Sequence, residues 1–465
     1  LHTQRRRQRQ MCIKRQVEDN LAVIDIGKTS AKILCFDRGG NLINDTRLKP
    51  NWIVNKGISE LDVNHYWNWI MDSLQVFYDE AGVRHTIVTA HGCTFALIRN
   101  EKLALPILDY ENEPPTEINK EFDNIKPSFS ETYTPRLPMG LNYAVHIFWR
   151  QKKFPEIFEE CDSILSLPQY WGWKFTGKKV SEISYIGCHS YLWSPKRNEP
   201  SSLTKKKGWD KKFPKFKRAG EFLGSLELKI DKKLKIYNGL HDSNSSLYFY
   251  RSLGFKSFTL ISTGTWVVIF NTDTSLKKLD PERDMLCNIT VDNKPIATAR
   301  FMGGRDFDLI SHSYRSPINR ESIDYILGSD IFALPSFTSG GPFPKKVGEV
   351  VGKNITKRES LAALATIYLV CMTKEVLDLL DSKNTIVIDG GFANNMYYME
   401  LLKELCSTQK IYCNKRAEGT SLGAATIAFE NINGCRFDNP CKEIIGKKSN
   451  KMKQYYSKWK SLVCK

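Results

Sequence analysis

Asp242 is the residue whose type and setting point most directly to chemistry. It follows the segment 233–237 (KLKIY) and Gly239, and it stands between His241 and Ser243. A carboxylate at the end of such a segment can lie in a cleft and take the proton of a hydroxyl group, a role that gives about 10²–10⁴ in rate. An aspartate in this setting is also a common helix N-cap, so Asp242 alone does not decide between the two interpretations.

A second group of chemically suited residues follows the apolar run that begins at Leu21. Gly27 permits a tight turn, and the amides, hydroxyls and lysines that follow it suit phosphate oxygens. Asp25 stands at the expected strand end, where a carboxylate can hold Mg²⁺ through water. The pattern GxxxxGK[ST] is absent, so this is not a Walker A loop. An ordinary hairpin turn with an exposed lysine remains the alternative.

A third polar segment lies at 389–395 (DGGFANN), directly after an apolar run at 384–388. A double glycine lets a planar ring approach the backbone, and the two asparagine amides that follow can hydrogen-bond to it. A strand-to-helix turn with an asparagine cap would look the same.

These residues need elements to position them, and two segments predict the same design. Residues 21–37 (LAVIDIGKTSAKILCFD) and 257–271 (SFTLISTGTWVVIFN) each indicate a strand, a polar turn with a glycine, and a second strand. About 236 residues separate them, which favours a duplicated domain over a short repeat. Two such turns that face each other could hold a polyphosphate between them.

Elsewhere the pattern is mixed α/β. We expect strands at 86–90 and 384–388, and a long amphipathic helix at 357–380, with Thr356 and Glu359 at capping-box spacing. Residues 418–430 (EGTSLGAATIAFE) predict a helix of small residues suited to close packing. Beyond residue 431 the chain is lysine-rich and is expected to form a peripheral helix or tail.

Length, composition and charge limit the class of protein to which these elements can belong. A chain of 465 residues, 41% hydrophobic and 11% aromatic, indicates two folded domains. Its net charge of +17 is spread over 5–9, 205–218 and the end of the chain, which favours a solvated surface over a nucleic-acid groove. No apolar run reaches the about 18 residues of a membrane span. Residues 1–10 have no apolar core for a secretory signal, and we expect the natural start at Met11, with a mitochondrial-type leader as the alternative.

In order and spacing, these segments resemble the FGGY carbohydrate kinases of the actin-like ATPase superfamily, over about 21–430. The resemblance implies an α/β fold of two actin-like (ribonuclease H-like) domains, each a mixed sheet with flanking helices, and an ATP and sugar cleft between them. The expected divisions are a leader at 1–19, a sugar-binding domain at 20–248, a nucleotide-binding domain at 249–432 and a basic tail at 433–465.

The resemblance also implies roles for single residues. Asp242 matches the catalytic base and Asp25 the acidic position near Mg²⁺. The positions that match ATP contacts are Lys28, Thr29, Ser30, Lys32, Thr263, Gly264, Thr265, Gly303, Gly304, Gly391 and Asn394. The positions that match acceptor contacts are His91, Gly92, His241, Asp242 and Ser243. Lys28 departs from the family pattern, because many relatives have threonine or serine there.

The expected reaction is transfer of the ATP γ-phosphate to a primary hydroxyl of a ketose. The triplet 241–243 is similar to that of rhamnulokinase-like members, which favours 6-deoxyketohexoses such as L-rhamnulose or L-fuculose; pentuloses such as xylulose or ribulose, and polyols, are the alternatives. A non-catalytic actin-like nucleotide or sugar sensor is the alternative of another class, although a sensor has no need of the base at Asp242. We expect a cytoplasmic monomer or homodimer that binds a small-molecule sugar, and neither nucleic acid nor membrane.

Overall fold

The computed structural model describes residues 19–464, except 230, 315–316, 417, 433, 435–436 and 447–448. The predicted leader therefore lies outside the described residues, apart from Asp19. The described chain forms two compact units. The first runs as far as Gly254 and also includes Asn288–Pro295 and Thr420–Asn439. The second comprises Phe255–Cys287, Ile296–Gly419 and the chain from Pro440 onward.

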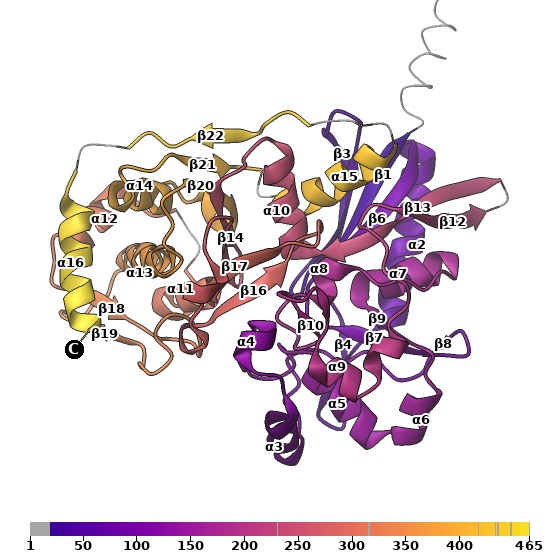
Figure 1. Cartoon of the computed structure of the whole chain (residues 1–465). Coiled ribbons are helices and arrows are strands. Elements are labelled where there is room, and N and C mark those ends of the chain that lie inside the picture. Colours follow the sequence, from indigo (N-terminus) through magenta and orange to yellow (C-terminus); the bar gives the residue numbers. More distant parts are fainter. Residues whose placement is uncertain are drawn as a thin grey trace, which may run out of the picture. The chain divides into compact units, whose positions relative to one another are not determined.

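The first unit is built on a six-stranded mixed sheet (Figure 1). Its strands, in order across the sheet, are β12 (Phe222–Lys229), β13 (Lys232–His241), β6 (Val83–Ala90), β1 (Asn20–Ile26), β2 (Ala31–Phe36) and β3 (Leu42–Leu48). The parallel pairs are β1 with β6 and β6 with β13, and the other neighbours are antiparallel. Every residue of β1 is buried, as expected of a central strand covered on both faces.

Three helices pack on this sheet: α2 (Val63–Glu80), α7 (Leu167–Thr176) and α10 (Asp242–Ser252). The strands outside this sheet form three small sheets: β4 (Trp52–Asn55) with β5 (Ile58–Leu61), β8 (Lys102–Leu103) with β7 (Phe95–Arg99) and β9 (Ser163–Ser166), and β10 (Trp193–Ser194) with β11 (Glu199–Pro200). The shorter helices of the unit are α3 (Thr116–Ile125), α4 (Phe129–Thr132), α5 (Ala144–Lys153), α6 (Pro155–Glu160), α8 (Ile183–Ile186) and α9 (Ser202–Lys206). The last helix of the unit, α15 (Gly419–Ile432), comes from far along the chain.

The second unit repeats the plan with a seven-stranded mixed sheet. Its order is β16 (Met285–Ile289), β17 (Pro295–Phe301), β15 (Val267–Asn271), β14 (Phe258–Thr263), β20 (Thr385–Gly390), β21 (Ile411–Asn414) and β22 (Cys441–Glu443). The run β17–β15–β14–β20–β21 has the same order and strand directions as β3–β2–β1–β6–β13. The prediction of a duplicated α/β design is confirmed.

Helix α13 (Arg358–Leu379) is the centre of the second unit and packs against α11 (Gly303–Ser311), α12 (Arg320–Leu327) and α14 (Met396–Leu405). Its side chains are buried on all sides from Ala362 to Thr373, so the expected amphipathic pattern is wrong. The expected capping box is wrong as well, because Lys357 is the N-cap and makes no side-chain cap bond. Neighbouring helices surround α13, so it needs no solvent-facing stripe.

The lysine-rich end of the chain contains a packed helix. Helix α16 (Lys451–Val463) buries Met452, Tyr455, Trp459 and Val463, and it contacts α12 and α14. The small strands β18 (Phe332–Leu334) and β19 (Glu349–Val351) pair beside it. The basic residues of this segment therefore lie on the outer face of a helix whose other face belongs to the second unit.

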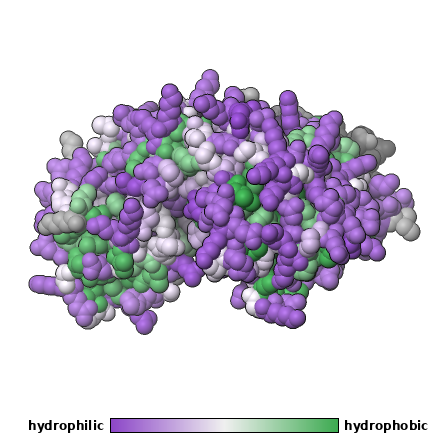
Figure 2. Space-filling model, turned by 60° about the horizontal axis from the view of Figure 1, so that its bottom comes forward, coloured by the Kyte–Doolittle hydropathy of each residue, from purple (hydrophilic) through white to green (hydrophobic). Residues whose placement is uncertain are grey.

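Apolar length alone does not make α13 a membrane span. Among the described helices it is the one long and apolar enough to cross a bilayer, yet 89% of its apolar window is buried inside the molecule. On the face drawn in Figure 2, hydrophilic residues cover most of the surface and apolar residues form separate groups.

Candidate active site

In the first unit, three parallel strands end in register at one sheet edge. Ile26 pairs with Ala90, and Ala90 pairs with His241. The residues that follow these strand ends are the turn at 27–30, the pair at 91–92 and the start of α10. The carboxyl edge of a parallel sheet is where α/β folds bind ligands. The sheet thus brings together the first-unit residues predicted from sequence.

Gly27 allows the first turn to close tightly. Its N–H donates to the carbonyl of Ser30 at 3.1 Å, and a Cβ at Gly27 would lie 2.8 Å from that oxygen. The tight turn predicted for Gly27 is confirmed. Thr29 and Ser30 at its tip are exposed, so their hydroxyls are accessible to a phosphate.

Asp25 is buried beneath this turn, with 6% of its surface exposed. Lys32 is its cross-strand neighbour, with Nζ 3.5 Å from Oδ2. Ser421 Oγ donates a hydrogen bond of 2.8 Å to the same oxygen. Ser421 was not predicted as a site residue; its signal was the small-residue helix at 418–430, because only small side chains let a helix approach this closely.

Asp25 fits the role of a single carboxylate ligand to Mg²⁺. Mg²⁺ keeps several waters and is held by one or two carboxylates together with substrate phosphates. Within the described residues, no cluster of three or more histidine, cysteine, aspartate or glutamate side chains could hold a metal by itself. A cation here would therefore depend on the nucleotide for most of its ligands.

Asp242 is the first residue of α10, and His241 is the N-cap. The Oδ1 atom of Asp242 accepts hydrogen bonds from the Ser243 amide at 2.5 Å and from the Ser243 hydroxyl at 3.2 Å. The side chain is 29% exposed. Burial raises the pKa of Asp242 to about 6, helped by the nearby charge of Asp25 and opposed by His91 and by the bonds from Ser243. A carboxylate with this pKa is ionised at neutral pH and is a stronger base than an ordinary aspartate.

His241 is packed as a neutral side chain next to that base. Burial lowers its pKa to about 3, and its Nδ1 accepts a hydrogen bond of 3.3 Å from the side-chain Nδ2 of Asn244. Its Nε2 lies 3.3 Å from Asp242 Oδ1. A Cβ at Gly92 would lie 2.8 Å from the same Nε2, so the glycine makes room for the ring. The predicted acceptor contacts of His241 and Gly92 stay predictions, but both residues shape the surroundings of Asp242.

In the second unit, the predicted nucleotide residues gather at the matching sheet edge. Thr263 pairs with Gly390 and Val267 with Phe301. The Gly304 amide donates to the Thr265 carbonyl at 3.2 Å. A Cβ at Gly304 would lie 2.3 Å from the Gly264 carbonyl oxygen. The start of α11, with Gly303 and Gly304, therefore packs directly on the exposed hairpin tip of Gly264 and Thr265.

The side chain of Thr263 is buried and binds the backbone of the turn that follows β20. Its hydroxyl donates to the Asp389 carbonyl at 2.6 Å and accepts from the Phe392 amide at 3.0 Å. Gly390 has φ of +85°, and a Cβ there would lie 1.9 Å from the Thr263 carbonyl oxygen, so only glycine fits. The short helix η4 (Gly391–Asn394) follows, with Gly391 and Asn394 exposed and with Asn395 capping α14.

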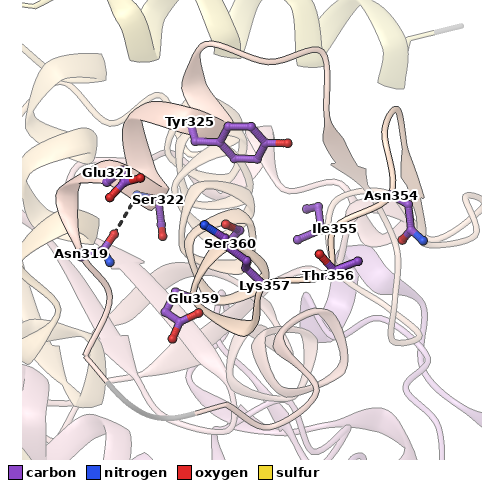
Figure 3. A pocket seen from close by; sticks show the side chains of 10 residues that line it. All are labelled: Asn319, Glu321, Ser322, Tyr325, Asn354, Ile355, Thr356, Lys357, Glu359 and Ser360. Carbon is purple, nitrogen blue, oxygen red and sulfur yellow. Dashed lines mark hydrogen bonds between the residues drawn. The ribbon is translucent and has the colours of Figure 1, made fainter.

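A separate pocket of about 620 Å³ lies in the second unit at the first turns of α12 and α13. Figure 3 shows its polar lining, with the hydrogen bond of 2.8 Å from the Ser322 amide to Asn319 at the cap of α12. Glu321 and Glu359 face the same space as Lys357. None of the predicted nucleotide residues lines this pocket.

Two family models match this chain. Residues 21–247 match the family described as FGGY family of carbohydrate kinases, N-terminal domain, and residues 255–435 match Carbohydrate kinase FGGY, C-terminal domain. The chain is 22% identical to a glycerol kinase of Ligilactobacillus salivarius, over 95% of this chain and 96% of that protein. It is 23% identical to a rhamnulokinase of Bacteroides thetaiotaomicron over 54% of each.

Solved structures show the same fold. A carbohydrate kinase from Novosphingobium aromaticivorans has a TM-score of 0.84 and 27% identity, over 96% of this chain and 98% of that one. A ligand-bound xylulose kinase from Lactobacillus acidophilus has a TM-score of 0.79 at 16% identity, over 96% of this chain and 97% of that one. The second likeness shows the fold alone.

Proposed function

Because the chain belongs to the FGGY family of carbohydrate kinases, which use ATP to phosphorylate hydroxyl groups, we propose that it phosphorylates a primary hydroxyl of a ketose with Asp242 as the base. The observation that carries the proposal is the place of Asp242, at the carboxyl edge of the first sheet with a pKa raised to about 6. Phosphoryl transfer needs an aligned acceptor, neutralised phosphate charge and a group that receives the hydroxyl proton. Asp242 has the basicity and exposure for the last role.

The proposed reaction is a direct transfer of the γ-phosphate to the acceptor hydroxyl. The acceptor oxygen attacks the γ-phosphorus as its proton passes to Asp242, the bond to the β-phosphate oxygen breaks, and ADP leaves. In the second unit, the exposed turn at Gly264 and Thr265 would hold nucleotide phosphates through its backbone amides and hydroxyl. In the first unit, the exposed hydroxyls of Thr29 and Ser30 are suited to phosphate oxygens as well. Mg²⁺, with Asp25 as one ligand, would neutralise phosphate charge.

For the acceptor we propose a 6-deoxyketohexose such as L-rhamnulose or L-fuculose, with pentuloses and polyols as alternatives. The support is the triplet 241–243 together with a relative named rhamnulokinase. Other relatives are named glycerol kinase, which keeps a small polyol as the competing acceptor. We further propose a cytoplasmic monomer or homodimer, with no nucleic-acid or membrane partner, and the domain divisions expected from sequence.

The test is a panel of ketoses, aldoses and polyols, with ADP release measured for the parent and for Asp242→Asn. The variant keeps the size of the side chain but removes the base, so kcat should fall by about 10² or more while ATP still binds. Asp79→Asn, an exposed carboxylate of α2 paired with Lys232, is the control and should leave kcat unchanged. A kcat for Asp242→Asn within about threefold of the parent would show that another group receives the proton.

A further inference from the structure

The basic segment at 205–218, which takes no part in the proposed reaction, ends at a cavity of about 620 Å³ in the first unit. Four stretches of chain line this cavity: the start of α8, β10 with the turn after it, the segment at 216–218, and the connection between β16 and β17 at 291–293. All four belong to the first unit. The lining residues are distinct from those of the candidate active site, and the volume is in the range of small-molecule sites.

Two aromatic rings form part of the cavity wall. The ring centroids of Trp193 and Phe216 lie 5.4 Å apart, with 54° between the ring planes. Phe216 is 37% exposed, whereas Trp193 is 9% exposed and its Nε1 has no hydrogen-bond partner among the described residues. Buried polar groups nearly always have a partner, so this indole N–H indicates an acceptor that the protein itself does not supply. An aromatic wall of this kind suits a planar ring.

The cavity also has one uncompensated positive charge. Lys217 pairs with Glu221, and Asp292 Oδ2 lies 2.5 Å from Arg251 Nη1, so these four charges balance in pairs. Arg218 is exposed, and within the part of the chain that the structure describes neither an ion pair nor a hydrogen bond uses its side chain. The planar fork of a guanidinium matches a phosphate or carboxylate group. The charge balance therefore favours a ligand with an anionic group.

The backbone that carries Arg218 is held from both sides. The buried side chain of Asn238 donates from Nδ2 to the carbonyls of Lys217 at 3.0 Å and Arg218 at 3.2 Å. The Ser181 amide donates to the Lys215 carbonyl at 3.1 Å, and the Ser181 carbonyl accepts from the Lys217 amide at 3.0 Å. The segment at 215–218 is thus fixed by its backbone, while the side chain of Arg218 makes no contribution to this support.

The remaining polar lining distinguishes between anions that carry a planar ring. Asn198 and Asn293 supply amide groups that donate and accept, and Asp292 supplies a carboxylate that only accepts. A nucleobase offers both N–H donors and ring acceptors to such a set. A simple aromatic acid has the ring and the charge but lacks the donors. The lining therefore fits a nucleotide better than an aromatic acid.

We propose that this cavity is a binding site for a nucleoside monophosphate, separate from the catalytic site. The base lies against the rings of Trp193 and Phe216, and the phosphate pairs with Arg218. Neither Asp242 nor the turns of the second unit take part, so the proposal goes beyond the proposed function and does not depend on it.

The first experiment compares ligands by titration calorimetry on the full chain, with AMP as the probe. Adenosine lacks the phosphate, ribose 5-phosphate lacks the base, and indole-3-carboxylate keeps a planar ring and a charge without the exocyclic donor. AMP should bind at least about fivefold more tightly than each of them, because each lacks one of the interactions. A smaller margin over any of the three, or no saturable binding of AMP at millimolar concentration, overturns the proposal.

The second experiment locates bound AMP by hydrogen exchange and mass spectrometry. AMP should slow exchange at 193–198, 215–218 and 290–293, with or without protection of the nucleotide turns of the second unit. Protection confined to 263–266 and 302–306 would mean that AMP binds only at those turns, and it overturns the proposal. Protection of neither set overturns it as well.

The third experiment changes the cavity wall. Arg218→Ala should weaken AMP binding at least about tenfold and Arg218→Lys less, while the urea midpoint stays that of the parent because Asn238 binds only the backbone there. Phe216→Leu keeps an apolar side chain without the aromatic face and should weaken binding at least about threefold. Lys215→Ala is the matched control, an exposed lysine of the same segment outside the lining, and should change Kd less than about twofold.

Unchanged AMP affinity in Arg218→Ala or in Phe216→Leu overturns the proposal. An equal loss in Lys215→Ala overturns it too, because binding would then follow the general positive charge of the segment. None of these measurements requires turnover, so a failure of the proposed kinase reaction would leave their outcome intact.

Discussion

At the scale of single residues, the chemistry depends on a carboxylate that is neither fully buried nor fully solvated. Asp242 is 29% exposed, and burial is the main cause of its raised pKa. Full exposure would leave a weak base, and complete enclosure without a partner would leave the carboxyl protonated at neutral pH. The neighbouring His241 is neutral and adds no positive charge that would lower the basicity.

This environment predicts the acid limb of the rate profile. The base must be ionised, so kcat/KM for the acceptor should fall about tenfold per unit as the pH decreases below about 6, the pKa of Asp242 in the folded protein. The profile should be measured from pH 4.5 to 8 at saturating ATP, with circular dichroism as a check that the fold persists. A limb that begins only near pH 4 would show that the carboxyl has the pKa of a solvated aspartate.

At the scale of elements, the two glycine hairpins were predicted from sequence because their pattern is local. Each consists of adjacent apolar strands with a polar turn, and β1–β2 and β14–β15 appear where that pattern placed them. The wrong predictions concern α13. Its N-terminal sequence suggested a capping box, and its apolar residues suggested an amphipathic helix. The helix is enclosed by its neighbours, and no local pattern reveals which helices will surround another.

The contact of α15 with α10 gives a prediction at this scale. A Cβ at Gly423 would lie 1.9 Å from the Ser245 carbonyl oxygen, a backbone atom that cannot turn aside. Gly423→Ala should therefore cost about 1–3 kcal/mol of stability, because it forces the two helices apart. Activity should fall with it, since α10 begins at Asp242 and α15 carries Ser421 to Asp25.

Urea unfolding followed by far-UV circular dichroism, together with kcat/KM, would check this prediction. Gly446→Ala is the control, because the nearest atom to its added Cβ is Lys403 Cγ at 3.1 Å, part of a flexible side chain. An unfolding midpoint for Gly423→Ala equal to that of the parent would mean that the helices are not closely packed there.

At the scale of the whole molecule, the predicted site residues divide between two compact units. The residues around Asp242 belong to the first unit and the turns at 263–266 and 390–394 to the second. Local sequence pattern could predict each group but not the contacts that complete it. Ser421 reaches Asp25 across 396 positions, and Asp109 reaches Lys28 across 81, which are separations that no periodicity spans.

This division predicts how ligands protect the backbone from hydrogen exchange. A nonhydrolysable ATP analogue alone should slow exchange at least about fivefold at 263–266 and 302–306, because the exposed turns of the second unit would hold the nucleotide. Addition of the best acceptor should extend protection to 27–30 and 241–243 in the first unit. Mass spectrometry of peptic fragments would measure both. Protection by the analogue confined to the first unit would contradict the assignment of the nucleotide turns.

The late position of α15 in the chain has a consequence for biosynthesis. The first unit takes its last helix from Thr420 onward, after the chain of most of the second unit has already been made. On the ribosome, the nascent first unit must wait through all of that synthesis with Asp25 still lacking Ser421. The surface of α10 at Ser245, against which Gly423 will pack, is open during this interval and is available to chaperones or to other nascent chains. A pause in translation between residues 254 and 420 would therefore prolong the stage at which this protein is most exposed to misassembly.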